Sequence, residues 1–163
     1  MMTAFDRFFM QMALREAEKA AADGEVPTGC VIVEPASLAG SGEGAFDPDP
    51  TTARILARAH NQPEMLQDAT AHAEMLALTA AASAKGAWRL TGTRLYVTKE
   101  PCPMCAAALA WAQLGRLVYG ADDPRRGYTL FTPSLLHPRT EVVSGVLAGE
   151  AARLMTDFFK KQR

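Results

Sequence analysis

Two short motifs constrain this chain more than any other feature, because their side chains together can hold a metal ion. The motifs are His72-Ala73-Glu74 and Pro101-Cys102-Pro103-Met104-Cys105. They supply one imidazole, two thiols and one free carboxylate. Three nitrogen and sulfur ligands leave the fourth position of tetrahedral zinc open for water, which is typical of a catalytic rather than a structural site. The motifs therefore predict a catalytic zinc centre held by His72, Cys102 and Cys105.

The spacing also predicts how these side chains are presented. Cys102 and Cys105 are three positions apart, so a helix that begins near Cys102 points both sulfurs the same way. His72 and Glu74 converge only if their helix directs its N-terminal end at the site. The positive ends of two such helices favour thiolates and lower the thiol pKa. Glu74 is then interpreted as a proton shuttle beside the metal and not as a ligand.

Less specific interpretations exist for each motif alone. A lone Cys-x-x-Cys is also typical of a redox pair or of half a structural zinc knuckle, and a lone His in an Ala-rich helix is often packed in a core. A structural site with three cysteines would need Cys30, which lies in the apolar run 29–33 and is typical of a small core residue. Such a site would leave Glu74 without a role, so the joint pattern favours catalysis.

Composition limits the class of protein. A length of 163 residues predicts one domain, 1–163, with a substantial core. Three cysteines, two of them assigned to the metal, indicate a reducing compartment, and no apolar run reaches membrane length, so we expect a cytoplasmic protein without a membrane segment. The net charge of −1 leaves only local basic patches for nucleic acid, with Arg125-Arg126 and 160–163 as candidates.

Hydrophobic periodicity predicts alternating helices and strands, hence a layered α/β domain. An amphipathic helix is expected to end near Asp23-Gly24, with Asp6 on its polar side, and another amphipathic helix ends the chain. A loop is expected to carry His60-Asn61. The predicted strands are 29–33, 55–59, 94–98, 117–120 and 142–143, and the two remaining helices are 72–84 and 102–114.

Residues 34–54 interrupt this pattern with a stretch rich in Gly, Pro, Ser and Asp. Its glycines are followed neither by a Lys-Ser/Thr pair nor by a helix start, so a phosphate-binding loop is disfavoured. We interpret this segment as an exposed insertion between two strands.

A family resemblance rests on several segments besides the metal motifs, and it runs along nearly the whole chain except 34–54 and, more loosely, 128–137. The pair His-x-Glu and Pro-Cys-x-x-Cys is the known signature of zinc-dependent nucleobase deaminases. The chain resembles bacterial tRNA-specific adenosine deaminases, within the cytidine deaminase superfamily. The segments that carry the resemblance are Glu25-Val26-Pro27-Thr28-Gly29, His60-Asn61, 68–75, 95–106, 118–121, 145–147 and Asp157-Phe158-Phe159.

This resemblance implies a three-layer α/β/α fold with a central mixed five-stranded sheet. It also implies a homodimer, with one zinc ion per subunit and each active site near the partner. The implied reaction is hydrolytic conversion of adenosine to inosine at the wobble position of tRNA, with Glu74 moving protons between a zinc-activated water and the purine.

The resemblance also implies substrate contacts. Asn61 is expected to contact the base, and the C-terminal helix is expected to lie against the anticodon loop of the tRNA partner. Core packing is the alternative for the two phenylalanines of that helix. The implied substrate-binding residues are Asn61, Gly29, Cys30, Pro101, Phe158, Phe159 and Lys160.

Two other functions share parts of the pattern. A zinc-dependent deaminase of a free base or nucleoside, such as guanine, cytosine or a cytidine-like compound, would use identical core motifs. The aromatic and basic C-terminal helix and the His-Asn pair favour tRNA over that alternative. A non-catalytic, zinc-stabilised RNA-binding subunit would not need Glu74, which disfavours it.

Overall fold

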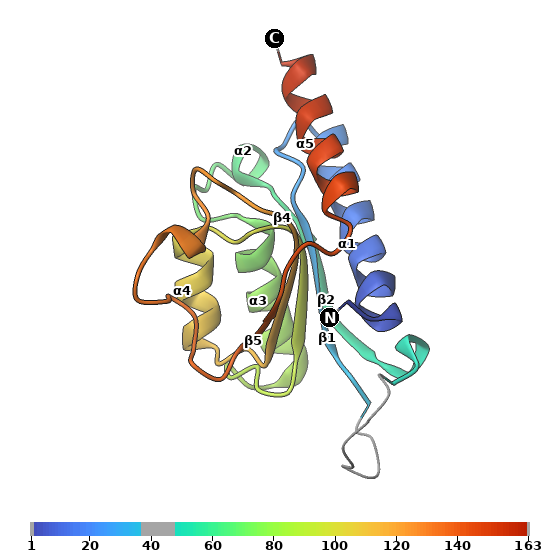
Figure 1. The fold of residues 1–163 in the computed structure, drawn as a ribbon, viewed down its shortest axis with the longest axis vertical. Helices are drawn as coiled ribbons and strands as arrows, with labels where there is room; N and C mark the ends of the chain where they lie inside the picture. The colour runs from blue at the N-terminus through green and yellow to red at the C-terminus, as the bar shows by residue number, and fades with distance from the viewer. Residues whose placement is uncertain (1, 37–47, 163) are drawn as a thin grey trace.

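A computed structural model describes residues 2–36 and 48–162 (Figure 1). The strands are β1 (Gly29–Glu34), β2 (Arg54–His60), β3 (Arg94–Lys99), β4 (Arg116–Ala121) and β5 (Glu141–Val143). The helices are α1 (Ala4–Ala22), α2 (Pro63–Leu66), α3 (Ala73–Lys85), α4 (Pro103–Trp111) and α5 (Ala148–Lys161), with short 3-10 turns η1 (Pro50–Thr52) and η2 (Tyr128–Leu130).

The five strands form one mixed sheet in the order β2-β1-β3-β4-β5. Strand β1 pairs antiparallel with β2 and with β3, whereas β4 pairs parallel with β3 and with β5. Helices α1 and α5 cover one face of the sheet, and α3 and α4 cover the other (Figure 1). The expected α/β/α architecture with a mixed five-stranded sheet is therefore confirmed.

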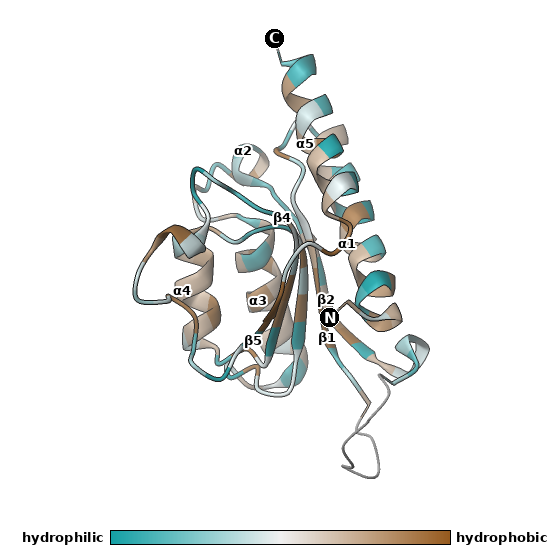
Figure 2. Cartoon of the chain, viewed as in Figure 1, coloured by the Kyte–Doolittle hydropathy of each residue, from teal (hydrophilic) through white to brown (hydrophobic). Residues whose placement is uncertain are grey.

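Two buried clusters lie on the two faces of this sheet, because successive side chains of a strand point to opposite faces. Cys30 and Ile32 of β1 pack toward α3 and α4, while Val31 and Val33 pack toward α1. The central strands are buried on both faces and therefore consist largely of hydrophobic residues, as Figure 2 shows. Among the described residues, no helix is long and apolar enough to cross a membrane.

Asp6 departs from the expectation that it lies on the polar side of α1, because it is fully buried. Its carboxylate accepts hydrogen bonds from the Tyr96 hydroxyl and from the Arg116 guanidinium, each at 3.0 Å. It also accepts from the backbone N–H of Thr3, whose hydroxyl caps α1 in return. A buried charge is tolerated where such partners satisfy it, and helical spacing alone does not reveal partners on distant strands.

Boundaries differ from expectation near the loops. His60, expected in a loop, is the last residue of β2, and the following segment contains the short helix α2. Helices α3 and α4 begin one residue after His72 and Cys102, and α4 ends at Trp111, earlier than expected. The ends of the 34–54 segment include parts of β1, η1 and β2, and residues 37–47 of the predicted exposed insertion lie outside the described residues.

Candidate active site

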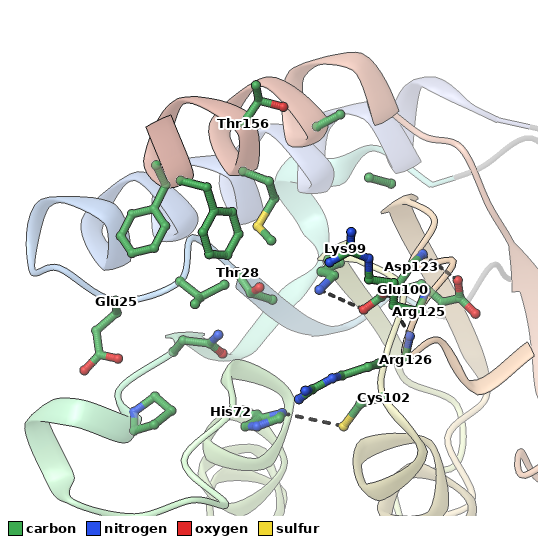
Figure 3. Close-up of a pocket in the computed structure, with 18 of the residues that line it drawn as sticks. Glu25, Thr28, His72, Lys99, Glu100, Cys102, Asp123, Arg125, Arg126 and Thr156 are labelled. Carbon is green, nitrogen blue, oxygen red and sulfur yellow. Dashed lines mark hydrogen bonds and ion pairs between the residues drawn. The ribbon is translucent and has the colours of Figure 1, made fainter. Parts of the chain in front are cut away.

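Three side chains with metal-binding atoms meet where α3 and α4 begin (Figure 3). His72 is the N-cap residue of α3 and Cys102 is the N-cap residue of α4, while Cys105 lies in the first turn of α4. The Nδ1 atom of His72 is 3.6 Å from each of the two sulfurs, and all three ligand atoms lie within 4.8 Å of one another. The structure thus brings together the predicted metal-binding residues.

Both helices present their N-terminal ends to this cluster, as the spacing predicted. Neither His72 nor Cys102 makes a side-chain capping hydrogen bond, and Pro103 occupies the first turn of α4, where a missing N–H costs nothing. The positive end of a helix stabilises nearby thiolates. The local backbone therefore favours the deprotonated sulfur that a metal needs.

The two thiols have opposite protonation tendencies without a metal. A hydrogen bond from Cys105, supported by one from His72, lowers the pKa of Cys102 to about 4. The same hydrogen bond, together with burial, raises the pKa of Cys105. The hydrogen bond to Cys102 raises the pKa of His72. One thiolate is thus ready for a metal, and the second must release its proton when the metal binds.

Glu74 lies in the first turn of α3 and is 4% exposed, but it is not part of the three-ligand cluster. Burial is the main cause that raises its pKa to about 6, against the opposing effects of a backbone hydrogen bond and the charge of His72. A carboxyl group with a pKa near neutrality can both accept and deliver a proton at physiological pH. Its position beside the cluster therefore suits a proton carrier.

A cavity of about 950 Å³ opens over the cluster. In Figure 3, His72 and Cys102 lie on one side of this cavity and α5 lies on the opposite side. The remaining sides are lined by the loops before β1 and after β2, β3 and β4. The residues that line it include Glu25, Thr28, Asn61, Glu64, Glu74, Lys99, Glu100, Asp123, Arg125, Arg126, Phe158 and Phe159.

Three of the expected substrate-binding residues lie on this cavity. Asn61 lines it, and the amide oxygen of Asn61 accepts a hydrogen bond of 2.8 Å from the backbone N–H of Ala73, which begins α3. Phe158 is half-buried and Phe159 is 46% exposed, with their rings edge to face at 5.3 Å. Core packing is therefore wrong for the exposed Phe159, whereas for the partly buried Phe158 it stays an alternative.

Four other expected substrate-binding residues are not among the lining residues of the cavity. Gly29 packs against α1, where an added Cβ would lie 2.3 Å from backbone atoms, and Cys30 is fully buried in the core. The Pro101 carbonyl accepts a hydrogen bond from the backbone of Tyr128. Lys160 is exposed near the end of α5. Contact between these four residues and a substrate stays a prediction.

Sequence reasoning missed one wall of the cavity, the loop that follows β4. Arg125 and Arg126 were predicted as a candidate basic patch for nucleic acid but not as part of the active-site cavity, and Asp123 and Glu100 were not singled out. Fold rules could have predicted this wall, because ligands of α/β folds bind beyond the carboxyl ends of parallel strands. Strands β3 and β4 are parallel, and both end at this side of the cavity.

Comparisons with known proteins agree with this site. Residues 5–163 match the family model of MafB19-like deaminases. The tRNA-specific adenosine deaminase of Bacillus subtilis (strain 168) is 40% identical, over 97% of this chain and 91% of its own length. A solved structure from a study of A-to-I editing by tRNA:A34 deaminases at the wobble position is 38% identical, with a TM-score of 0.73 over 90% of this chain and 98% of its own.

A guanine deaminase from Bacillus subtilis is also similar, at 31% identity and a TM-score of 0.56, over 74% of this chain and 66% of its own. Fold and site together thus define a deaminase. Within that class, the chain belongs to the tRNA-specific adenosine deaminase family.

Proposed function

We propose that this protein hydrolytically deaminates adenosine to inosine at the wobble position of a tRNA, with one zinc ion held by His72, Cys102 and Cys105. The observation that carries the proposal is the convergence of these three ligands beside a cavity that His72, Cys102 and Glu74 line. Family membership supports the choice of substrate, because the relatives that are 40% and 38% identical are named as tRNA deaminases, whereas the guanine deaminase is 31% identical over a smaller share of the chain.

The donor set fits zinc in kind and in spacing. Tetrahedral zinc with roughly 2.3 Å bonds to sulfur and roughly 2.0 Å bonds to nitrogen separates the two atoms by about 3.5 Å. The His72 Nδ1 atom lies 3.6 Å from each sulfur, so little rearrangement is needed to hold the ion. When bound, zinc lowers the pKa of a coordinated water and so supplies a nucleophile at neutral pH.

Glu74 is the proton carrier of the proposed reaction. Its carboxylate takes the proton from the attacking water and delivers it to the purine ring nitrogen, and it then assists the departure of ammonia. Its buried position keeps this proton from exchanging freely with solvent. Asn61 contacts the base through its amide NH₂ group, because its amide oxygen is already bonded to Ala73.

The aromatic end of α5 completes the substrate site. Phe158 and Phe159 line the cavity from α5, the helix that lies across the cavity from His72 and Cys102 in Figure 3, and splayed bases of an anticodon loop can stack on their rings. Lys160 follows these rings on the exposed surface and contributes to phosphate attraction. An unpaired loop base suits such a cavity because it avoids most of the cost of extrusion.

The experiment uses zinc-loaded protein and a transcribed tRNA with adenosine at the wobble position, and it scores inosine by sequencing. Free adenosine, guanine and cytosine are assayed in parallel for ammonia release. We expect inosine at that single position and no ammonia from the free compounds. Ammonia from guanine without tRNA editing would replace this proposal with the free-base alternative.

A homodimer is part of the proposal. Helix α4 lies at the edge of the molecule (Figure 1), and its sequence, residues 103–111, contains no charged side chain. Its last residue, Trp111, is 80% exposed, and Trp88, Leu130 and Phe131 are exposed too. Exposed apolar groups of this kind mark association surfaces.

Light scattering tests the dimer and should give twice the subunit mass. The variant Trp111→Glu should give monomers, and a monomeric wild-type protein would exclude the dimer.

A further inference from the structure

A buried carboxylate holds the loop that follows β4. Glu100 is 4% exposed and lies between β3 and the metal-binding Cys102. One oxygen accepts a 2.8 Å hydrogen bond from the backbone N–H of Asp123, and the other accepts from the backbone N–H and the hydroxyl of Thr129, at 3.0 and 2.7 Å. The backbone of Gly127 packs directly against this carboxylate. Both ends of the loop are therefore anchored to Glu100.

Asp123 organises the middle of the same loop. One of its oxygens accepts the backbone N–H groups of Arg125 and Arg126, each at 3.0 Å. The other oxygen pairs with the Lys99 ammonium at 2.8 Å. The charge of Lys99 is thus neutralised, and the backbone of the two arginines is held in place.

The guanidinium groups of these arginines remain available. Arg125 and Arg126 line the cavity, and neither makes an ion pair within 2–36 and 48–162. Figure 3 shows the Arg126 side chain extending from the loop into the cavity. A positively charged side chain that lines a cavity without a carboxylate partner suits an anionic ligand, and the guanidinium matches two phosphate oxygens at once.

At the other end of the cavity the charged lining residues are both carboxylates, whereas the wall with the two arginines carries Asp122 besides the already bonded Glu100 and Asp123. Glu25 and Glu64 line the wall next to α2, and the Glu25 carboxylate accepts the backbone N–H groups of Glu64 and Met65. A substrate that carries a base and a phosphate would therefore place its phosphate on the wall that carries Arg125 and Arg126. The charge asymmetry thus gives the bound strand a direction.

We infer that Arg126, with Arg125, forms a phosphate subsite of this cavity, and that Glu100 is the positioning residue that builds it. The ligand is the phosphodiester group next to the nucleotide whose base enters the cavity. This inference rests on the proposed function, because a free base carries no phosphate.

The first test removes the charge from the ligand. Anticodon stem-loop RNAs carry a single neutral methylphosphonate on the 5′ or the 3′ side of the target adenosine. We expect wild-type kcat/KM to fall roughly 10- to 100-fold for one of these two linkages, as expected for loss of a charge-assisted hydrogen bond. Arg126→Gln should raise KM more than it lowers kcat on the natural linkage, and it should lose nothing further on the neutral linkage.

Arg139→Gln is the matched control, since Arg139 is exposed in a turn and does not line the cavity. It should keep the wild-type response to both neutral linkages. An unchanged wild-type kcat/KM on both neutral RNAs, or an undiminished response in Arg126→Gln, would overturn the inference. Absence of inosine from wild-type protein on the natural stem-loop is a different result, because it refutes the proposed function itself.

The second test separates positioning from general stability. Glu100→Gln retains the shape of the side chain but replaces one acceptor oxygen with a donor, so at least one backbone N–H of the loop loses its partner. We expect the KM defect of Arg126→Gln with full zinc content, and no further defect when the two substitutions are combined. Fully additive defects, or an unchanged KM with only a lower Tm, would show that Glu100 does not act through Arg126.

Discussion

The buried network around Asp6 gives a quantitative prediction about what holds α1 to the sheet. Asp6→Ala removes an acceptor that serves the Tyr96 hydroxyl, the Arg116 guanidinium and the Thr3 backbone N–H. Asp6 itself is fully buried, and the Arg116 side chain is largely buried. The substitution therefore leaves a cation without its partner in a poorly solvated position, which is the costly way to break such a pair.

The size of the effect follows from that geometry. Breaking a buried ion pair from one side costs about 3–5 kcal/mol. For a domain of this length each kcal/mol lowers Tm by roughly 2–4 °C, so we expect a decrease of about 6–20 °C. Asp6→Asn should cost less, because its single acceptor oxygen can still serve either Tyr96 or Arg116, although not both.

The assay is urea and thermal unfolding of zinc-loaded protein, with Glu18→Ala on the exposed side of α1 as the control. The control should lie within about 0.5 kcal/mol of wild type. Combining Asp6→Ala with Arg116→Ala should cost less than the sum of the two, since both break the same contact. If Asp6→Ala proved as mild as Glu18→Ala, or if the double variant were additive, the network would not be what anchors α1.

Three further predictions concern the site and its surroundings. Glu74→Gln should keep its zinc, measured by atomic absorption, and lose roughly 10²- to 10⁴-fold in kcat, the usual contribution of a general acid-base group; retained turnover would remove Glu74 from the mechanism. Cys102→Ala should purify with little zinc and no activity, and zinc bound at wild-type stoichiometry would point to other ligands. Burial raises the pKa of Tyr128 to about 12, above its value of about 10 in the unfolded chain. Folding thus favours the neutral phenol, so this stability is complete below pH about 10 and is lost as the pH rises through about 12. Tyr128→Phe should flatten the alkaline decline in urea midpoint, and an unchanged decline would mean that another group causes it.

Much of this protein was determined by local sequence alone. The motif spacing was sufficient to predict the cluster of His72, Cys102 and Cys105 and the end-on approach of two helices, because a helix start fixes the direction of its first side chains. Short apolar runs were sufficient to locate the strands, since buried strands need continuous hydrophobic residues. Each helix start and each strand depends on residues within a few positions of one another, whereas the meeting of His72 with the two cysteines, 30 and 33 positions away, was predicted from the metal-binding chemistry that the two motifs share.

Other features were decided only by the tertiary structure. Asp6 can be buried because Arg116 and Tyr96, on two different strands, donate hydrogen bonds to its carboxylate. The wall with Arg126 exists because the parallel pairing of β3 and β4 brings Glu100 under the loop that follows β4. Each of these contacts joins segments separated by tens of residues, and the free energy of such a contact depends on which side chains the complete fold brings together, a quantity that no local spacing contains.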